Sequence, residues 1–219
     1  MDVLARGLLD AEKLIQDGIA SIRAKRQPHL IQISDNHSPE LIAQQGAVLP
    51  MFEQLRAQGL PDLNTNEAPP AELYSANAYV GARGIAQALA HGADIVITGR
   101  CVDSAVVVGV LAHEFGWRWD DWDRLAAGTL AGHVIECGAQ ATGGLFTDWA
   151  QVPDWAHMGY PVIDCAADGS FELSKPDGTG GLIHPGAVAE QILYEVGDPA
   201  NYLMPDVTCD FREVGVDAL

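Results

Sequence analysis

A helix, a continuous apolar strand and a second helix follow one another in the middle of the sequence, and this order restricts the fold more than any other feature. The first helix, Gly84–His91, ends at Gly92, and the strand Asp94–Thr98 has the sequence Asp-Ile-Val-Ile-Thr. A strand without polar alternation is typical of parallel sheets that helices cover on both faces. The second helix, Asp103–Phe115, starts after only a short loop. The order therefore predicts a βα unit within an α/β fold.

The residues that precede this unit continue the same alternation. Leu8–Ala24 has apolar residues at helical spacing, and His29–Ser34 is a short apolar run with the features of a strand. Met51–Gln58 predicts a further short helix. We therefore expect residues 1–116 to form an α/β layer with a mostly parallel sheet covered by helices.

The second half of the chain mixes helical patterns with short strand-like pieces and Gly-rich turns. Trp122–Gln140 has helical apolar spacing, and Pro185–Val196 predicts a closing helix. Between them, the strand-like pieces Tyr160–Ala166 and Ser170–Leu173 alternate with Gly-rich turns. Residues 117–219 are therefore expected to be a Trp- and Gly-rich, mixed continuation of the same domain.

Charge and cysteine usage exclude several classes of function. The formal net charge of −18 would repel a phosphate backbone, so nucleic acid is not expected as a partner. The four cysteines stand far apart and form no CxxC motif, which is typical of reduced thiols. No apolar run approaches the ~20 residues of a membrane span, and the N-terminus lacks the pattern of a signal peptide. We expect a cytoplasmic protein with no membrane partner.

The loop that follows the apolar strand is the first candidate site. Ligands of open parallel sheets bind where the strands end and the next helix presents unpaired N–H groups. Arg100 could hold a carboxylate or phosphate there, with Gly99 beside it, and Asp103 or Ser104 could contact a ligand. Asp103 and Ser104 could equally serve only as caps of the helix.

A second candidate site lies where the long central helix is predicted to end. Glu136 is a candidate acid or base, and Cys137 is a conceivable nucleophile, although a free cysteine more often packs as a small hydrophobe. A Gly-rich segment follows directly, and its candidate ligand-binding residues are Gln140, Thr142, Gly143 and Gly144.

A second Gly-rich loop precedes the last helix. Glycines allow backbone N–H groups to approach an anion closely. The candidate ligand-binding residues of this loop are Lys175, Gly178, Thr179, Gly180 and Gly181. The loop matches no phosphate-binding motif, and an ordinary turn explains Pro-Asp-Gly equally well.

Histidines and tryptophans indicate structure rather than metal or cofactor chemistry. The seven histidines include no HExxH motif and no facial triad, so we expect no metal ion and no organic cofactor. His133 is interpreted as a hydrogen-bonded structural residue. The five tryptophans are expected to act as packing or subunit-contact anchors. Subunit contacts of this kind make a homo-oligomer one of the expected alternatives.

Several ordered motifs resemble those of one known family. They include Ser75-Ala76-Asn77-Ala78-Tyr79, Gly92-Ala93-Asp94-Ile95-Val96-Ile97-Thr98-Gly99-Arg100, Glu136-Cys137-Gly138-Ala139-Gln140, Gly178-Thr179-Gly180-Gly181 and Tyr194-Glu195-Val196-Gly197-Asp198-Pro199. From about Tyr74 to Arg212 the chain resembles the acyclic terpene utilisation (AtuA-like) family. The resemblance adds Asn77 to the candidate ligand-binding residues. It also implies that the chain is an internal portion of a longer, here incomplete, domain.

The resemblance implies a role in pathways that degrade citronellol, geraniol and branched acyl-CoA compounds, without assigning a reaction. Our first hypothesis is a protein that binds or converts a small acyl or terpenoid metabolite, with Arg100 and the two Gly-rich loops holding its anionic end. Glu136 is the proton-transfer candidate. The alternatives are a non-catalytic partner of a pathway enzyme, such as an acyl-CoA carboxylase, and a truncated fragment without function.

Overall fold

The computed structural model describes residues 30–32, 53, 56–61, 66–68, 71 and 79–218. The predicted helix Leu8–Ala24 and the candidate residue Asn77 lie outside these residues. The helices are α3 (Arg83–Ala90), α4 (Ala105–Glu114), α5 (Trp122–Glu136) and α6 (Pro185–Leu193), with the short 3₁₀ helices η1 (Gln140–Thr142), η2 (Trp149–Gln151) and η3 (Trp155–His157). The strands are β1 (Leu30–Gln32), β2 (Ile95–Ile97), β3 (Val162–Cys165), β4 (Phe171–Ser174), β5 (Tyr202–Leu203) and β6 (Thr208–Cys209).

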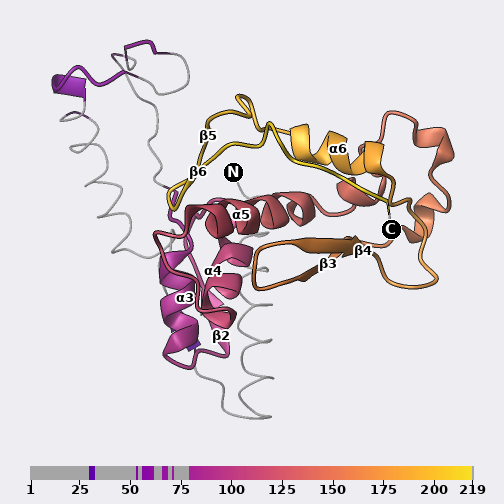
Figure 1. The fold of residues 1–219 in the computed structure, drawn as a ribbon, viewed down its shortest axis with the longest axis horizontal. Helices are drawn as coiled ribbons and strands as arrows, with labels where there is room; N and C mark the ends of the chain where they lie inside the picture. The colour runs from indigo at the N-terminus through magenta and orange to yellow at the C-terminus, as the bar shows by residue number, and fades with distance from the viewer. Residues whose placement is uncertain are drawn as a thin grey trace, which may run out of the picture.

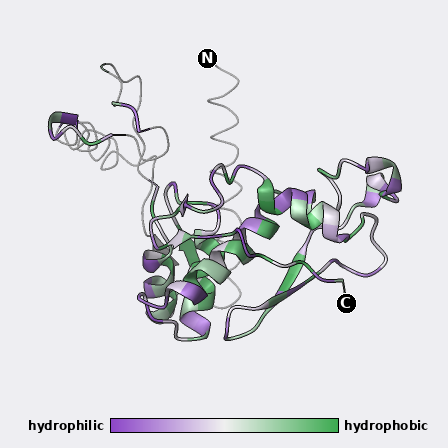
Figure 2. Ribbon diagram, turned by 45° about the horizontal axis from the view of Figure 1, so that its top comes forward, coloured by the Kyte–Doolittle hydropathy of each residue, from purple (hydrophilic) through white to green (hydrophobic). Residues whose placement is uncertain are grey.

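These elements form a mixed α/β structure around α5, which runs across the centre of the molecule (Figure 1). Helix α4 packs on one side of α5 and helix α6 on another, while the β3–β4 hairpin lies beneath it. Figure 2 shows that hydrophobic residues gather inside the helix cluster and that hydrophilic residues dominate its outer side. The central helix therefore contacts α4, α6, η1, β3 and β6.

The predicted mostly parallel sheet is not what the described residues contain. Strands β1 and β2 do pair in parallel, with Ile31 opposite Val96, but only over three residues each. The other two sheets of the described residues, β3–β4 and β5–β6, are antiparallel pairs. The continuous apolar pattern of β2 thus identified a strand and a parallel neighbour correctly, while the extent of the sheet was overestimated. The expectation of an incomplete domain stays a prediction.

Close helix contacts explain two glycines of the sequence. A Cβ added to Gly109 of α4 would lie 2.7 Å from the side chain of Ile85 in α3, and one added to Gly132 of α5 would lie 2.7 Å from the Cα of Ser104. Real Cβ atoms do not approach other atoms so closely, so only glycine permits these crossings. The crossing at Gly132 holds the start of α4, and with it the preceding Asp103, against the last third of α5.

The predicted helix boundaries differ from the observed ones by a turn at the C-terminal ends. Helix α5 ends at Glu136 rather than Gln140, because Cys137 leaves the helical conformation and Gly138 has a φ of +60°. Helix α6 ends at Leu193 rather than Val196. Apolar residues continue past both ends, and periodicity alone therefore extended both predictions.

Strands β5 and β6 were not predicted from the sequence. Each is only two residues long, which is too short for an alternating pattern. Their hairpin nevertheless completes the core, because Cys209 and the following Phe211 are buried with Leu125 of α5. This packing brings Tyr202 of β5 next to the central helix.

Candidate functional site

The candidate site lies where the end of α5, the start of α4, the turn after α6 and strand β5 meet. We call this place the acidic junction and define it by six residues, Asp103, Glu136, Cys137, Tyr194, Glu195 and Tyr202. The three carboxylates lie close enough to the Cys137 thiol and the Tyr202 phenol to raise the pKa of both groups. Asp103 and Glu195 are exposed, whereas Glu136, Cys137 and Tyr202 are half-buried. The junction therefore passes from solvent into the protein.

Glu136 and Cys137 form a hydrogen-bonded pair at the end of α5. The Cys137 thiol donates to Oε2 of Glu136 over 3.0 Å. This hydrogen bond, together with burial and the neighbouring carboxylates of Glu195 and Asp103, raises the pKa of Cys137 to about 11. At neutral pH only about one thiol in ten thousand is then ionised. The reactive form of a cysteine is the thiolate, so this environment favours Glu136 over Cys137 as the reacting group.

Asp103 reaches the junction through the helix crossing described above. It precedes Ser104, which occupies the N-cap position of α4 and packs on Gly132 of α5. Ser104 makes no side-chain capping hydrogen bond. The interpretation of Ser104 as a simple helix cap therefore has no support in the structure, and its close packing against α5 explains its burial.

Glu195 reaches the junction through an unusual backbone conformation. It lies just after α6 and has a φ of +57°, in the left-handed region that residues other than glycine rarely occupy. A side-chain hydrogen bond from the phenol to the Glu195 carboxylate raises the pKa of Tyr194. Strained conformations of this kind persist where the surrounding structure holds them, frequently at functional sites.

Tyr202 supplies a neutral hydroxyl on the inner side of the junction. Burial, followed by the negative charges of Asp103, Glu136 and Glu195 and by Cys209, raises the pKa of its phenol. The ring packs edge-on against His133, with centroids 5.9 Å apart, and against Phe211 at 5.4 Å. Tyr202 therefore remains protonated and keeps a hydrogen-bond donor available.

Arg100 lies on the loop that leads to Asp103 and is exposed to solvent. Its Nη1 donates to the hydroxyl of Tyr79 over 3.3 Å, and its guanidinium lies 5.4 Å from the centre of the same ring. Backbone hydrogen bonds between Val80 and this loop hold the arrangement in place. The loop thus carries a cation, Arg100, three residues before the carboxylate of Asp103.

The two Gly-rich segments meet, and their backbone amides already have acceptors within the chain. The amide of Leu182 donates to the carbonyl of Thr142 over 2.7 Å, and the hydroxyl of Thr142 donates to the carbonyl of Gly159 over 2.6 Å. Four further amides bond to backbone carbonyls, those of Gly143, Gly144, Gly180 and Gly181. Lys175 closes its own loop by donating to the carbonyl of Thr179 over 2.7 Å. An anion would have to displace these bonds.

Two of the predicted ligand-binding residues take other positions. Gly178 has a φ of +72° and nothing near it, as in an ordinary turn. Gln140 begins η1 three residues after Cys137, and its side-chain amide is near enough to the phenol of Tyr194 to act on the pKa of that phenol. Gln140 therefore lies at the acidic junction. Gly178 does not, and no other atom lies within 4 Å of the position that its Cβ would take.

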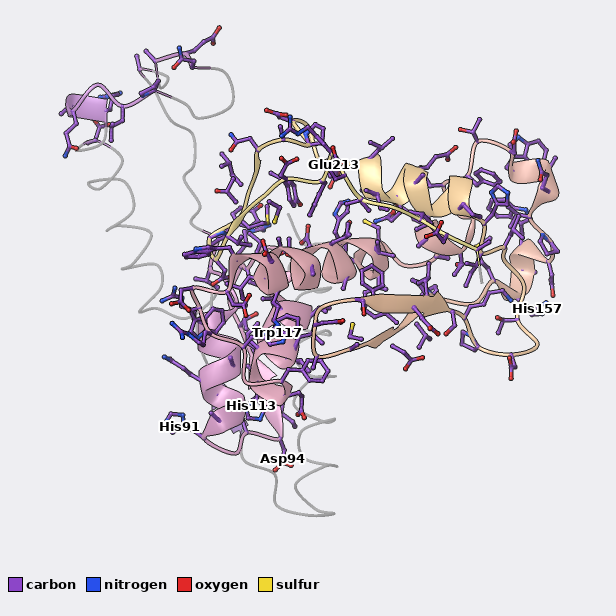
Figure 3. The ribbon with its side chains drawn as sticks, in the orientation of Figure 1. His91, Asp94, His113, Trp117, His157 and Glu213 are labelled. Atoms are coloured by element: carbon purple, nitrogen blue, oxygen red, sulfur yellow. The ribbon has the colours of Figure 1, made fainter. Side chains whose placement is uncertain are left out.

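Tryptophans divide into buried and exposed groups. Trp117 is only 5% exposed, its Nε1 donates to the carbonyl of Ala167 over 2.9 Å, and it lies beneath α5 (Figure 3). Trp119 is half-buried and stacks with Arg83. Trp149 and Trp155, in η2 and η3, are 65% and 48% exposed. A surface for a partner is therefore available at η2 and η3 rather than at Trp117 or Trp119.

Among the histidines of residues 79–218, His133 contacts the acidic junction through the ring of Tyr202. Figure 3 shows His91 and His113 at the same end of helices α3 and α4, and His157 at the opposite extremity of the molecule. Over residues 79–218 and the shorter described segments, no group of three His, Cys, Asp or Glu side chains is arranged to hold a metal ion.

Sequence reasoning missed four residues of this region, namely Tyr194, Glu195, Tyr202 and Gln191. Tyr194 and Glu195 stood among the family motifs without a role. Tyr202 reaches the site only through the unpredicted β5–β6 hairpin. Gln191 is an ordinary polar residue of α6 in the sequence, and only packing shows that it is buried against His133.

Comparison with known proteins identifies one related family. The sequence model described as "Acyclic terpene utilisation family protein AtuA" matches residues 36–219. No curated protein and no solved structure matches the chain significantly. Among the described helices none has the length and apolar character needed to cross a membrane.

Proposed function

The chain belongs to the acyclic terpene utilisation family AtuA, and from this premise we propose that it binds a branched acyl metabolite at the acidic junction and transfers a proton to or from it. The observation that carries the proposal is the pairing of the half-buried Glu136 carboxylate with a thiol that stays neutral. A carboxylate in this setting can accept a proton, whereas the protonated thiol beside it is a poor acceptor.

In this proposal Glu136 removes a proton from the carbon next to the thioester carbonyl of the substrate. The C–H bond breaks, the proton moves to a carboxylate oxygen of Glu136, and the electron pair moves onto the carbonyl oxygen as an enolate. The Tyr202 phenol, which keeps its proton, donates a hydrogen bond to that oxygen. Return of the proton from Glu136 regenerates the acyl group, so the step balances without a redox partner.

Arg100 is proposed to hold the anionic end of the same ligand. Its guanidinium is exposed and follows β2 on the loop that continues to Asp103. Bidentate contacts of arginine with carboxylates and phosphates are strong and directional. With a net charge of −18, the chain offers little other attraction for an anion. We further propose that the protein acts in the cytoplasm, in the breakdown of acyclic terpenes such as citronellol and geraniol.

Proton transfer can be measured without knowledge of the complete reaction. The purified protein is incubated with a branched acyl-CoA, such as isovaleryl-CoA, in heavy water, and mass spectrometry follows deuterium uptake next to the thioester. Glu136→Gln is expected to slow the uptake by about a hundredfold or more, and Tyr202→Phe by about a hundredfold. The matched control Glu114→Gln alters an exposed glutamate at the end of α4. Uptake that is equal in Glu136→Gln and Glu114→Gln would refute the proposal.

A non-catalytic role as a partner of a pathway enzyme is the second candidate, and the exposure of Trp149 and Trp155 favours it. Exposed tryptophans are frequent energetic centres of protein interfaces. If an acyl-CoA carboxylase of the same pathway co-purifies with the protein, the double change Trp149→Ala and Trp155→Ala should abolish the association. Trp122→Ala, at a comparably exposed tryptophan of α5, is the control. Retention of the complex by the double variant excludes this surface.

A further inference from the structure

The turn of the β5–β6 hairpin contacts the start of α3 through one side chain. Asp206 lies in this turn, between Leu203 and Thr208, and its Oδ2 accepts a hydrogen bond from the backbone amide of Ala82 over 2.6 Å. Ala82 is the N-cap residue of α3, where backbone amides have no acceptor within the helix. A carboxylate at this end also interacts favourably with the helix dipole. Asp206 therefore caps α3 from a segment that is 124 positions away in the chain.

A glycine makes this contact possible. A Cβ added to Gly81 would overlap with all three atoms of the Asp206 carboxyl group. Any side chain at position 81 would therefore push the hairpin turn away from α3. The half-buried Asp206 thus fixes the residues that lead into α3. We call residues 79–82 the α3 entry segment.

The α3 entry segment is also the part of the chain that holds Arg100. The amide of Val80 donates to the carbonyl of Arg100 over 3.1 Å, and the amide of Val102 donates to the carbonyl of Val80 over 3.1 Å. The hydroxyl of Tyr79 lies 3.3 Å from Nη1 of Arg100, and its ring centre lies 5.4 Å from Cζ. The segment therefore contacts both the backbone and the guanidinium of Arg100. Asp206 holds the other end of the same segment, two residues further along the chain.

We propose that Asp206 is a positioning residue, which fixes the α3 entry segment and thereby directs the Arg100 guanidinium toward the anionic end of the acyl ligand. This inference rests on the proposed function, because it concerns the anion contact that is assigned there to Arg100. The same hairpin carries Tyr202, the proposed donor to the substrate carbonyl. The hairpin thus serves both ends of the ligand, since β5 supplies the hydroxyl and the turn supports the cation.

The negative charge of Asp206 separates this role from simple electrostatics. A carboxylate in the neighbourhood of an anion site repels the anion, so removal of the charge alone would strengthen binding. A positioning role predicts the opposite result when the hydrogen bond to Ala82 is lost. Asp206→Ala removes both the charge and the acceptor. Asp206→Asn removes the charge but keeps an amide oxygen that can accept from the same backbone amide.

Calorimetric titration with two thioesters measures the effect on the anionic end of the ligand. Isovaleryl-CoA carries phosphates, and isovaleryl-N-acetylcysteamine has the same acyl group without them. Asp206→Ala is expected to weaken binding of isovaleryl-CoA by about tenfold, which is the effect of one hydrogen bond to a charged group. It should leave the affinity for the uncharged thioester unchanged. Asp206→Asn should bind isovaleryl-CoA at least as tightly as the original protein.

Two results of these titrations overturn the inference. The first is binding of isovaleryl-CoA by Asp206→Ala that equals or exceeds that of the original protein, because the charge effect would then outweigh any positioning. The second is equal weakening for both thioesters, because this would indicate a general loss of structure.

Gly81→Ala is an independent variant that also covers the case in which Asp206→Ala does not fold. Its Cβ would displace the Asp206 carboxylate without altering any charge, so binding of isovaleryl-CoA should weaken by about tenfold again. Gly215→Ala, whose Cβ would meet nothing within 4 Å, and Asp217→Ala, at an exposed carboxylate, are the controls. Both should stay within about twofold of the original protein. Full affinity of Gly81→Ala overturns the inference.

A double-mutant cycle with Arg100→Ala separates this inference from the proposed function. Asp206→Ala should cause no further loss of isovaleryl-CoA affinity once Arg100 is absent, because both changes act through one guanidinium. Additive losses overturn the inference. Weakened binding by Arg100→Ala beside full binding by Asp206→Ala refutes the positioning role only.

The NMR signal of the Arg100 Nε–H group measures the positioning without a ligand. This signal should shift in Asp206→Ala and remain in place in Asp206→Asn. If it shifts in this way while Arg100→Ala binds isovaleryl-CoA normally, the positioning role stands and the proposed anion contact is refuted. A signal that Asp206→Ala leaves in place overturns the inference. Proton transfer is tested separately, by deuterium uptake in Glu136→Gln.

Discussion

Glu136 and Cys137 are neighbours in the chain whose side chains also contact each other, so the ionisation of one depends on the state of the other. The hydrogen bond to Glu136 is the largest cause of the raised pKa of Cys137. At residue scale, the acidic junction is therefore a place where neighbouring carboxylates and burial keep a thiol protonated. This property can be tested through the reactivity of the thiol.

Glu136→Gln is expected to increase the rate at which iodoacetamide alkylates Cys137. Removing the carboxylate removes the largest cause of the raised pKa, so the thiolate fraction below about pH 9 should rise by about tenfold or more. Mass spectrometry of the Cys137 peptide after timed labelling at about pH 8 measures the rate. Glu114→Gln serves as the control. An unchanged rate in Glu136→Gln would show that Glu136 does not govern this thiol.

Glu195 should reveal a conflict between stability and function. Its φ of +57° suits glycine, so Glu195→Gly is expected to leave stability unchanged or to raise it by up to about 1 kcal/mol. The same change removes a carboxylate of the junction and the partner of Tyr194. Urea unfolding measures the free energy, and deuterium exchange on acyl-CoA should slow. A loss of more than about 1 kcal/mol would mean that Glu195 stabilises the fold rather than the site.

The crossing of α4 and α5 is the decisive arrangement at element scale. Gly132 lets the two helices approach until the backbone of Ser104 lies against α5, and this contact places Asp103 at the acidic junction. Neither helix has an N-cap side chain that bonds its first turn. Packing rather than capping therefore holds these helix ends.

Gly132→Ala is expected to destabilise the protein by about 1–3 kcal/mol, because the new Cβ would lie 2.7 Å from the Cα of Ser104 and force the helices apart. Urea unfolding followed by circular dichroism gives the free energy. Gly215→Ala is the matched control, since its Cβ would meet nothing within 4 Å, and it should stay within about 0.5 kcal/mol of the original protein. Equal effects of the two changes would contradict the close crossing.

Raised pKa values of several neutral groups give the whole molecule a common dependence on pH. The Glu136 hydrogen bond raises the pKa of Cys137 to about 11, and burial raises the pKa of Cys209 to about 11. The phenols of Tyr194 and Tyr202 shift in the same direction. Because an unfolded thiol ionises at about pH 8.5, the unfolded chain loses these protons first.

The free energy of unfolding is therefore expected to keep its full value below about pH 8.5 and to decrease as the pH rises toward about 11. Urea titrations at several alkaline pH values measure the slope. Cys209→Ala should flatten it, since it removes one of the two strongly shifted thiols while altering a small side chain. A free energy that stays constant or increases over this range would contradict the assigned shifts.

The sequence alone determined the order of the helices and the family. Local signals located α3, α4, α5 and α6: Gly92 ends the first, the second follows the apolar strand after a short loop, the third has helical apolar spacing and Pro185 begins the last. Motif order indicated the AtuA family, whose model matches residues 36–219. It also identified Glu136, Cys137 and Asp103 as candidates. Their proximity was not predictable from spacing, because it depends on the crossing at Gly132 and the turn after α6.

Only the tertiary structure decided the extent of the sheets, the use of the Gly-rich amides and the position of Tyr202 beside the central helix. Glycine-rich loops look alike in sequence whether their N–H groups face a ligand or their own carbonyls. In this chain the amides of Gly143 and Gly181 bond internally. Tyr202 and Gln191 join the site through long-range packing, and such packing depends on the shapes of surfaces that are far apart in the chain and so has no local signature.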